Sequence, residues 1–397
     1  MRLLLLFTLA LSLLPVHSPR ADGKTLTVMM GLGEVEWRVM RGKVFPPFEK
    51  RERVKIRGLQ VESRDAIAKL EAMALAGRMR VDLIAQDNMQ LAPLVGKGLM
   101  EDLSSYRHLM PKEVIPRLIP VGEFQGRLYF FPYRPNVQIA YYNGPKFRSY
   151  GLKPPESWEE LLQVARRFKE EEGVGRVLLH GTLDLNTTTH VFEFIRSAGG
   201  DPLVLTDGGS RRAFHFLKRL APYLSPETRK ANWNTTNKYL ANESVYLARN
   251  WPFGVNVIVR DAGKKEIKAY HGWRGPVRES HVLGGEVLGI PRGARHKALA
   301  LAFIRYLLSK PVQELLVAEM GWPSARRDAY GRVKAWQAPY FKAVLRALEH
   351  AEPRPNVLYW ATVNRALSEA FREVVLEGKA PGPVLKRYGK MLEDARR

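Results

Sequence analysis

Residues 282–323 read VLGGEVLGIPRGARHKALALAFIRYLLSKPVQELLVAEMGWP, and this stretch decides the fold class. A short apolar segment at 287–291 predicts a buried strand, which the turn sequence Pro-Arg-Gly closes. After Lys297 the apolar residues recur at helical spacing, at Leu299, Ala302, Phe303, Tyr306 and Leu307. A strand that leads through a tight turn into a long amphipathic helix is typical of an α/β protein.

The N-terminal part of the chain repeats this alternation. Strands are predicted at 25–30, 54–61 and 81–85, and helices around 37–48 and 65–76. Strands that alternate with helices predict a parallel, doubly wound sheet, and such sheets bind ligands beyond the carboxyl ends of their strands. Asp87 and Asn88 follow the third predicted strand, so they are expected to border a ligand site.

The chain is long enough for two lobes. It has 397 residues, and a single hydrophobic core stops growing near about 250–300 residues. A hydrophobic content of 45% can bury both lobes, and no segment has a disordered composition.

The N-terminus has the pattern of a secretory signal peptide. Arg2 precedes an apolar run at 3–14 that is too short to span a bilayer, and Pro15 ends it. We therefore expect a signal peptide at 1–21 and a periplasmic mature protein, with an uncleaved anchor or a buried helix as the alternatives. The chain has no cysteine, so neither a lipid attached at a lipobox nor a disulfide is possible.

Three further segments connect these features to a known family. Residues 126–142 read GRLYFFPYRPNVQIAYY and predict two extended pieces, broken at Pro132 and Pro135, where the chain crosses between lobes. Ser157 and Glu160 in PPESWEELLQVARRFKE have the capping-box spacing of a helix start. The third segment, residues 81–106, reads VDLIAQDNMQLAPLVGKGLMEDLSSY. Taken in their order along the chain, the three segments and 282–323 resemble the cluster 1 extracellular solute-binding proteins, which are the sugar-binding subunits of ABC importers.

The resemblance implies a two-lobed α/β fold of the type II periplasmic-binding-protein class, with several segments crossing the hinge. It places lobe 1 at 22–133 plus 286–330 and lobe 2 at 134–285 plus 331–397. It further implies a monomer that closes on a small-molecule carbohydrate and delivers it to the transmembrane subunits of an ABC permease.

No catalytic constellation accompanies these motifs. The sequence lacks a zinc-protease motif, a nucleophile elbow, a Walker loop and cysteine, and its nine histidines have no metal-ligand spacing. We expect no enzyme activity, no cofactor and no metal. A secreted carbohydrate-active enzyme remains an alternative, because carboxylate pairs are judged by their separation in space.

The charge is strongly positive. The 63 Lys and Arg residues against 40 Asp and Glu residues give a formal net charge of +23. A field of this size attracts polyanions and acidic ligands, but no basic motif interleaved with aromatic residues indicates a nucleic-acid reader. An anionic sugar derivative, such as a sugar phosphate, and a secreted protein that binds anionic surfaces therefore remain alternatives.

Aromatic residues that could stack on a pyranose ring lie mainly in two segments. Trp251 and Phe253 belong to an Arg-Asn-Trp-Pro-Phe loop that resembles the trehalose, maltose and α-glucoside branch of the family. Trp360 stands where the maltose-binding protein places a stacking tryptophan, and Trp322 is expected at the lobe boundary. Packing in the core is the alternative for Trp251 and Trp360.

Planar polar groups could bind adjacent sugar hydroxyls through pairs of hydrogen bonds. The resemblance matches Asp87 to the cleft aspartate of the family, Asn136 to a crossover position usually held by Asp, and Arg354 to an arginine of the trehalose branch. Positions after the first and third strands add further candidates, namely Glu36, Trp37 and Asn88. A surface salt bridge is the alternative for Asp87, Glu36 and Arg354.

Two departures from the disaccharide branch affect the predicted ligand. The chain has Asp184-Leu-Asn-Thr-Thr188 in place of Tyr-Glu-Gly-Leu-Thr, and Glu286 in place of a tryptophan after two glycines. A carboxylate at Glu286 would repel a phosphate but could accept hydrogen bonds from hydroxyls. We therefore expect a neutral gluco-configured di- or small oligosaccharide ahead of an anionic derivative.

Overall fold

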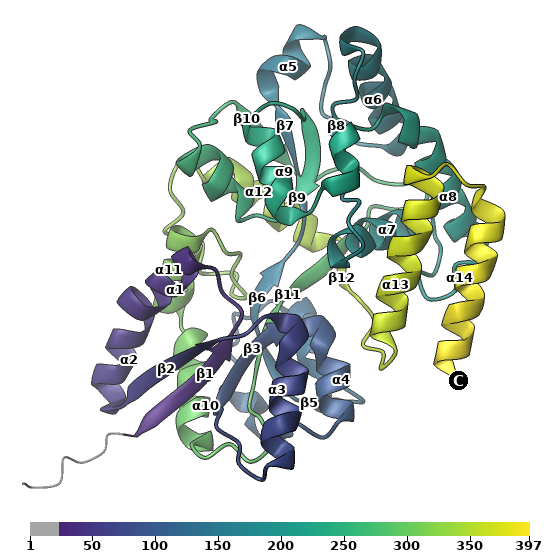
Figure 1. Ribbon diagram of the computed structural model, residues 1–397. Helices are drawn as coiled ribbons and strands as arrows, with labels where there is room; N and C mark the ends of the chain where they lie inside the picture. The colour runs from purple at the N-terminus through teal and green to yellow at the C-terminus, as the bar shows by residue number, and fades with distance from the viewer. Residues whose placement is uncertain (1–23) are drawn as a thin grey trace, which may run out of the picture.

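Two main β-sheets organise residues 24–397, the part of the chain that this computed structural model describes (Figure 1). Each sheet forms the centre of one lobe, as expected for the fold class. The expected signal peptide, 1–21, lies outside the described residues. No helix within 24–397 is long and apolar enough to cross a membrane.

The sheet of the first lobe has the order β12-β11-β3-β1-β2, and β6 pairs with β11 as well. Its strands are β1 (Thr25–Met30), β2 (Lys55–Gln60), β3 (Leu83–Asp87), β6 (Phe130–Asn136), β11 (His281–Gly289) and β12 (Ala351–Pro353). Strand β1 is parallel to β2 and β3, but β11 is antiparallel to β3 and β6. The prediction of a parallel sheet therefore holds for β1 to β3, and β12 is parallel to β11, but the sheet is mixed because β11 is antiparallel to both β3 and β6.

The sheet of the second lobe has the order β10-β7-β9-β8. Its strands are β7 (Ile139–Asn143), β8 (Val177–Leu178), β9 (Leu247–Asn250) and β10 (Ile267–Tyr270). Strand β7 is antiparallel to β9 and β10, and β8 is parallel to β9. A separate two-stranded ribbon joins β4 (Glu123–Phe124) to β5 (Arg127–Leu128).

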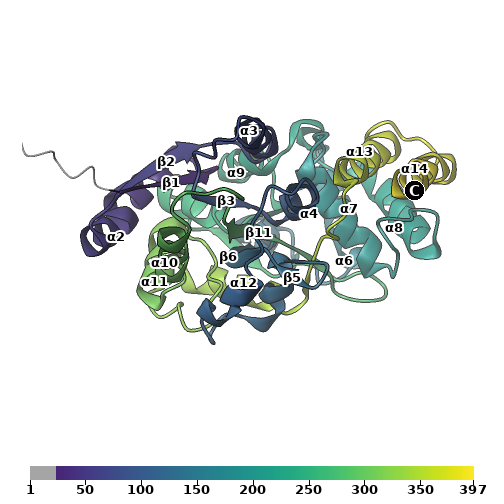
Figure 2. The ribbon, with the colours of Figure 1, turned by 90° about the horizontal axis from the view of Figure 1, so that it is seen from below.

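Helices cover both faces of each sheet. In the first lobe, α1 (Glu34–Val39), α2 (Phe45–Glu52), α10 (Lys297–Leu307) and α11 (Lys310–Met320) pack on one face, and α3 (Ser63–Leu75) and α4 (Leu91–Gly96) on the other. Figure 2 shows the strands between α10 and α3. Both faces are covered because successive side chains of a strand point to opposite faces of the sheet. On β1, Val28 faces the first group of helices and Met29 faces the second.

Helices also cover both faces of the sheet in the second lobe. One face of its sheet carries α6 (Trp158–Glu172), α7 (Leu185–Ser197), α8 (Gly208–Leu220), α13 (Trp360–Phe371) and α14 (Pro381–Arg396), and the other carries α9 (Trp233–Ala241) and α12 (Ala338–Glu349). The short helix α5 (Gly144–Ser149) follows β7. Ala140 contributes to the first core, whereas Tyr141 contributes to the second.

Local signals set the helix ends. Ser157 caps α6 by accepting a hydrogen bond from the Glu160 N–H at 3.3 Å, as predicted. The Glu160 carboxylate accepts from the Glu156 N–H at 2.7 Å, one residue before the predicted capping-box partner. At the end of α11, Gly321 adopts the left-handed conformation (φ 70°), which turns the chain so that Trp322 packs inward.

The crossing strand β6 differs from its prediction. It runs through both Pro132 and Pro135 without a break. Its register with β11 shifts between Glu286 and Val287, and this irregularity accommodates residues that cannot donate a backbone hydrogen bond. The lobe boundaries expected at 133/134 and 285/286 fall inside β6 and β11, and they remain a prediction.

Candidate functional site

The register of three strands brings polar residues together where the first sheet meets the second lobe. Asp87 is the last residue of β3 and lies opposite Glu286 of β11. Glu286 also lies opposite Arg134 of β6, and Gly284 lies opposite Asn136. Residues that are far apart in the sequence thus share one edge, which we call the junction site.

Arg354 joins this edge to the second lobe. Its side chain is only 3% exposed, and its Nη2 lies 3.6 Å from Oδ1 of Asp87. Its Nη1 donates to the hydroxyl of Thr189 on α7 at 3.2 Å. The cluster of Asp87, Arg354 and Thr189 therefore contains groups from both lobes.

The indole of Trp251 lies against the same point of β11. A Cβ atom built on Gly284 would lie 3.2 Å from Cη2 of Trp251 and 3.4 Å from Nη2 of Arg354. Trp251 follows β9, and its carbonyl accepts a hydrogen bond from the Tyr141 hydroxyl at 2.9 Å. The absence of a side chain at Gly284 thus lets an aromatic ring and a guanidinium approach the strand together.

Trp360 lies next to Arg354 but is largely enclosed. It is 6% exposed, its ring packs 5.7 Å from that of Phe192, and the Arg354 guanidinium carbon lies 5.9 Å from its centroid. The structure places Trp360 both in the core of the second lobe and beside the cluster.

A second network of charges continues the junction site into the first lobe. Arg134 donates to Glu286 at 2.9 Å and to Glu36 at 3.3 Å, and its guanidinium carbon lies 4.1 Å from the ring centroid of Trp322. The Trp322 indole N–H donates to the same Glu36 oxygen at 2.8 Å. Glu36, Glu286 and Trp322, which were separate predictions from the sequence, thus meet at one arginine.

Burial and neighbouring charges alter the protonation of these groups. Burial raises the pKa of Glu286 to about 7, opposed by Arg134 and assisted by Glu36 and Asp87. Burial lowers the pKa of Arg354, although Asp87 and Glu193 oppose this effect. For Arg134 burial also disfavours the charge, but Glu286 and Glu36 outweigh it and raise the pKa.

Several buried polar atoms of the junction site have no hydrogen-bond partner within residues 24–397. They are Nε of Arg134, Oε2 of Glu286, Nε of Arg354 and Nε1 of Trp360. Buried polar atoms are normally paired, so a cluster of unpaired ones indicates groups that a polar ligand can satisfy when the site opens. The set contains both donors and acceptors, which suits a molecule with hydroxyl groups.

The remaining predicted residues do not all join this cluster. Asn88 donates to the carbonyl of Leu283 at 3.3 Å. Phe253 packs edge-on against Trp233, 5.4 Å between centroids. Trp37 donates to Gln60 in the first lobe and lines a separate open cavity of about 730 Å³. Within the described part of the chain, none of these three side chains forms a hydrogen bond, ion pair or ring contact with Arg354 or Arg134, and Asn136 lies opposite Gly284 in the strand pairing.

Sequence reasoning missed two residues of the junction site. Arg134 lies two residues before Asn136 on the same strand and hence on the same face, so alternation could have identified it. Thr189 carried no such signal, because nothing in its local sequence indicates contact with Arg354. Within 24–397 no group of three or more His, Cys, Asp or Glu residues could hold a metal ion.

Solved structures share this fold over nearly the whole chain. Maltose-bound MalE3 of T. maritima has a TM-score of 0.82 at 21% identity, covering 94% of this chain and 100% of that one. The GacH receptor of Streptomyces glaucescens, solved without ligand and with acarbose, has a TM-score of 0.80 at 19% identity, covering 94% and 99%. At these identities the similarity establishes the fold.

Sequence comparisons identify the family. An uncharacterized ABC transporter extracellular-binding protein of Pyrococcus horikoshii is 22% identical over 153 residues, which are 38% of this chain and 33% of that protein. The match thus spans about a third of the length of this relative. The family described as bacterial extracellular solute-binding proteins matches residues 43–343, which is most of the chain. The chain belongs to the bacterial extracellular solute-binding protein family.

Proposed function

We propose that this protein is the solute-binding subunit of an ABC importer and that it captures a neutral carbohydrate, a di- or small oligosaccharide, between its lobes. The junction site carries the proposal, because unpaired buried donors and acceptors surround a position where Trp251 and Arg354 approach Gly284. Aromatic faces and planar hydrogen-bonding groups are the two kinds of side chain that bind a sugar. Solved structures with this fold hold maltose, acarbose and tagatose, which supports the choice of ligand class.

The charges of the junction site favour a neutral ligand. Its carboxyl groups, Asp87, Glu36 and Glu286, number three, and its guanidinium groups, Arg134 and Arg354, number two. Each guanidinium has a carboxylate within 4 Å, which offsets its attraction for a phosphate. The net charge of +23 therefore does not extend to this site.

Binding requires the lobes to separate and close again. Arg354 is buried between Asp87 and Thr189, which belong to different lobes, so a ligand would reach its guanidinium when the two lobes move apart. Closure follows if the sugar contacts both lobes only in the closed state, which shifts the population toward it. The closed monomer would then deliver the unmodified sugar to the permease from the periplasm.

The test is calorimetric titration with a panel of neutral sugars and sugar phosphates, chosen by thermal shift. Asp87→Ala and Trp251→Ala should each weaken binding of the selected sugar at least about tenfold, because an unpaired buried partner costs about 1–3 kcal/mol. The control is Asp394→Ala, since this aspartate is exposed on α14. Unchanged affinity in both site variants would reject the junction site.

Two alternatives give different results in the same experiment. An anionic sugar derivative, which the overall charge favours, predicts binding of a phosphorylated ligand with no response to any neutral sugar. An enzyme predicts that the sugar is altered, whereas a transport protein returns it unchanged. Chromatography of the recovered ligand distinguishes these outcomes.

A further inference from the structure

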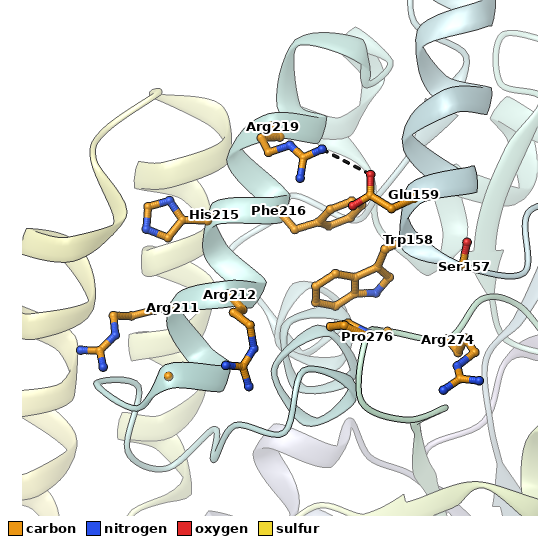
Figure 3. A pocket seen from close by; sticks show the side chains of 12 residues that line it. Ser157, Trp158, Glu159, Arg211, Arg212, His215, Phe216, Arg219, Arg274 and Pro276 are labelled. Atoms are coloured by element: carbon orange, nitrogen blue, oxygen red, sulfur yellow. Dashed lines mark hydrogen bonds and ion pairs between the residues drawn. The ribbon is translucent and has the colours of Figure 1, made fainter.

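The second lobe contains a hollow of about 790 Å³ that the proposed function does not use. Three segments line it: the start of α6, one face of α8 and the loop at 274–276 (Figure 3). Figures 1 and 2 both place α6 and α8 toward the outer side of the second lobe, away from β3 and β11 of the junction site. We call this hollow the arginine pocket.

The lining face of α8 carries positive charge. Gly208, Arg211, His215 and Arg219 follow one another at spacings of three or four residues, and Arg212 is adjacent to Arg211. In Figure 3, Arg211 and His215 extend from the side of α8 opposite to Trp158, Arg212 points toward the start of the helix, and Arg219 reaches Glu159. Cations near a helix N-terminus oppose the helix dipole, so the stability of α8 does not explain Arg211 and Arg212.

The pocket contains more guanidinium groups than acids. Its charged side chains are Arg211, Arg212, Arg219, Arg274 and one carboxylate, Glu159. Glu159 accepts from Arg219 at 3.3 Å, and Arg212 donates to the carbonyl of Ala198 at 2.7 Å. Within the described residues, Arg211 and Arg274 have no carboxylate partner, so the pocket has an unneutralised positive charge.

The floor of the pocket is rigid. The rings of Trp158 and Phe216 stack at 4.6 Å with an interplanar angle of 20°, and both side chains are buried. In the adjoining loop, Gly275 packs so closely that an added Cβ would lie 2.5 Å from Oγ of Ser197. A fixed floor and a fixed loop hold the hollow open without a ligand, which lowers the entropic cost of binding.

We propose that the arginine pocket binds a small multivalent oxyanion, such as a phosphate ester or a polycarboxylate. Its volume is in the range of small-molecule sites, about 300–1,000 Å³. Guanidinium groups bind phosphate and carboxylate through two parallel hydrogen bonds, and the lining supplies them from two segments, Arg211 from α8 and Arg274 from the loop. The proposal is independent of the carbohydrate proposal, because the two sites share no residue.

The test is calorimetric titration of the whole protein with pyrophosphate and with citrate at low salt. Both should bind saturably, and the Arg211→Ser/Arg274→Ser variant should weaken the binding at least about tenfold. The matched control is Arg78→Ser/Arg80→Ser, which removes the same charge from two exposed arginines of the first lobe. An unchanged thermal midpoint for each variant shows that the fold is intact.

Three outcomes would overturn the proposal. The first is the absence of saturable binding of either probe to the wild type. The second is an equal loss of affinity in both double variants, since it would mean attraction by the overall charge alone. The third is arginine-dependent binding to phosphatidylglycerol vesicles without binding of either soluble probe, because it would assign the pocket to a lipid surface.

Discussion

The junction site and the arginine pocket use the same cation in opposite ways. At the junction, Arg134 and Arg354 face carboxylates, and their side chains are only 18% and 3% exposed. In the arginine pocket, Arg211 and Arg274 have no carboxylate partner within the described residues and are exposed. The difference shows that the net charge of +23 is distributed unevenly, because carboxylates neutralise the arginines of one region and not those of the other.

The largest expected effect tests how much a buried ion pair contributes to the free energy of unfolding. Arg249 and Glu193 form an ion pair with side chains 2% and 3% exposed, and Glu193 also accepts from the Val282 N–H at the start of β11 at 3.0 Å. Arg249→Met leaves the Glu193 charge buried and unpaired, so it should lower the free energy of unfolding by about 3–5 kcal/mol. Urea unfolding measures this change.

The exposed pair of the arginine pocket is the matched control. Arg219 and Glu159 have side chains 59% and 64% exposed, so Arg219→Met should cost less than about 1 kcal/mol. Similar losses in the two variants would contradict the distinction between the regions.

The next effect concerns pH at the junction. The Glu286 carboxyl has an ordinary pKa of 4.5, but the folded protein holds its proton up to a pKa of about 7. The folded state therefore binds more protons than the unfolded state between these values, and it loses stability as pH rises through this window. Glu286→Gln removes this titration, so its stability relative to wild type should increase by about 2 kcal/mol between pH 5 and pH 8.

Chemical unfolding of both proteins at a series of pH values gives this difference. Glu34→Gln makes the same change at a glutamate whose side chain is 91% exposed, and its curve should run parallel to that of the wild type. If the Glu286→Gln curve is also parallel to the wild-type curve, the carboxyl is not held protonated at the junction.

The smallest effect is expected from salt. Binding of a neutral sugar at the junction site should change by less than about twofold between 0.01 M and 0.5 M salt, whereas pyrophosphate binding at the arginine pocket should weaken strongly as screening increases. Titrations of each ligand in the two buffers measure both responses in one protein. A strong response of sugar binding to salt would remove the contrast between the two regions and favour an anionic ligand at the junction.

The sequence by itself determined the α/β class, the strand at Thr25–Met30, the start of α6 at Ser157 and the position of Asp87 at a strand end. These features depend on periodicity and capping, which a window of a few residues contains. The same applies to the family, because its motifs keep their order along the chain.

Only the tertiary structure decided which side chains meet. Arg134 contacts Glu286 across a separation of 152 residues, and Arg354 contacts Thr189 across 165, so no local window contains either pair. The antiparallel course of β11, the enclosure of Trp360 and the arginine pocket likewise depend on packing between distant segments. Pairing of charges is a property of packing, because a guanidinium at a given sequence position can be neutralised or left free by whichever segment folds against it.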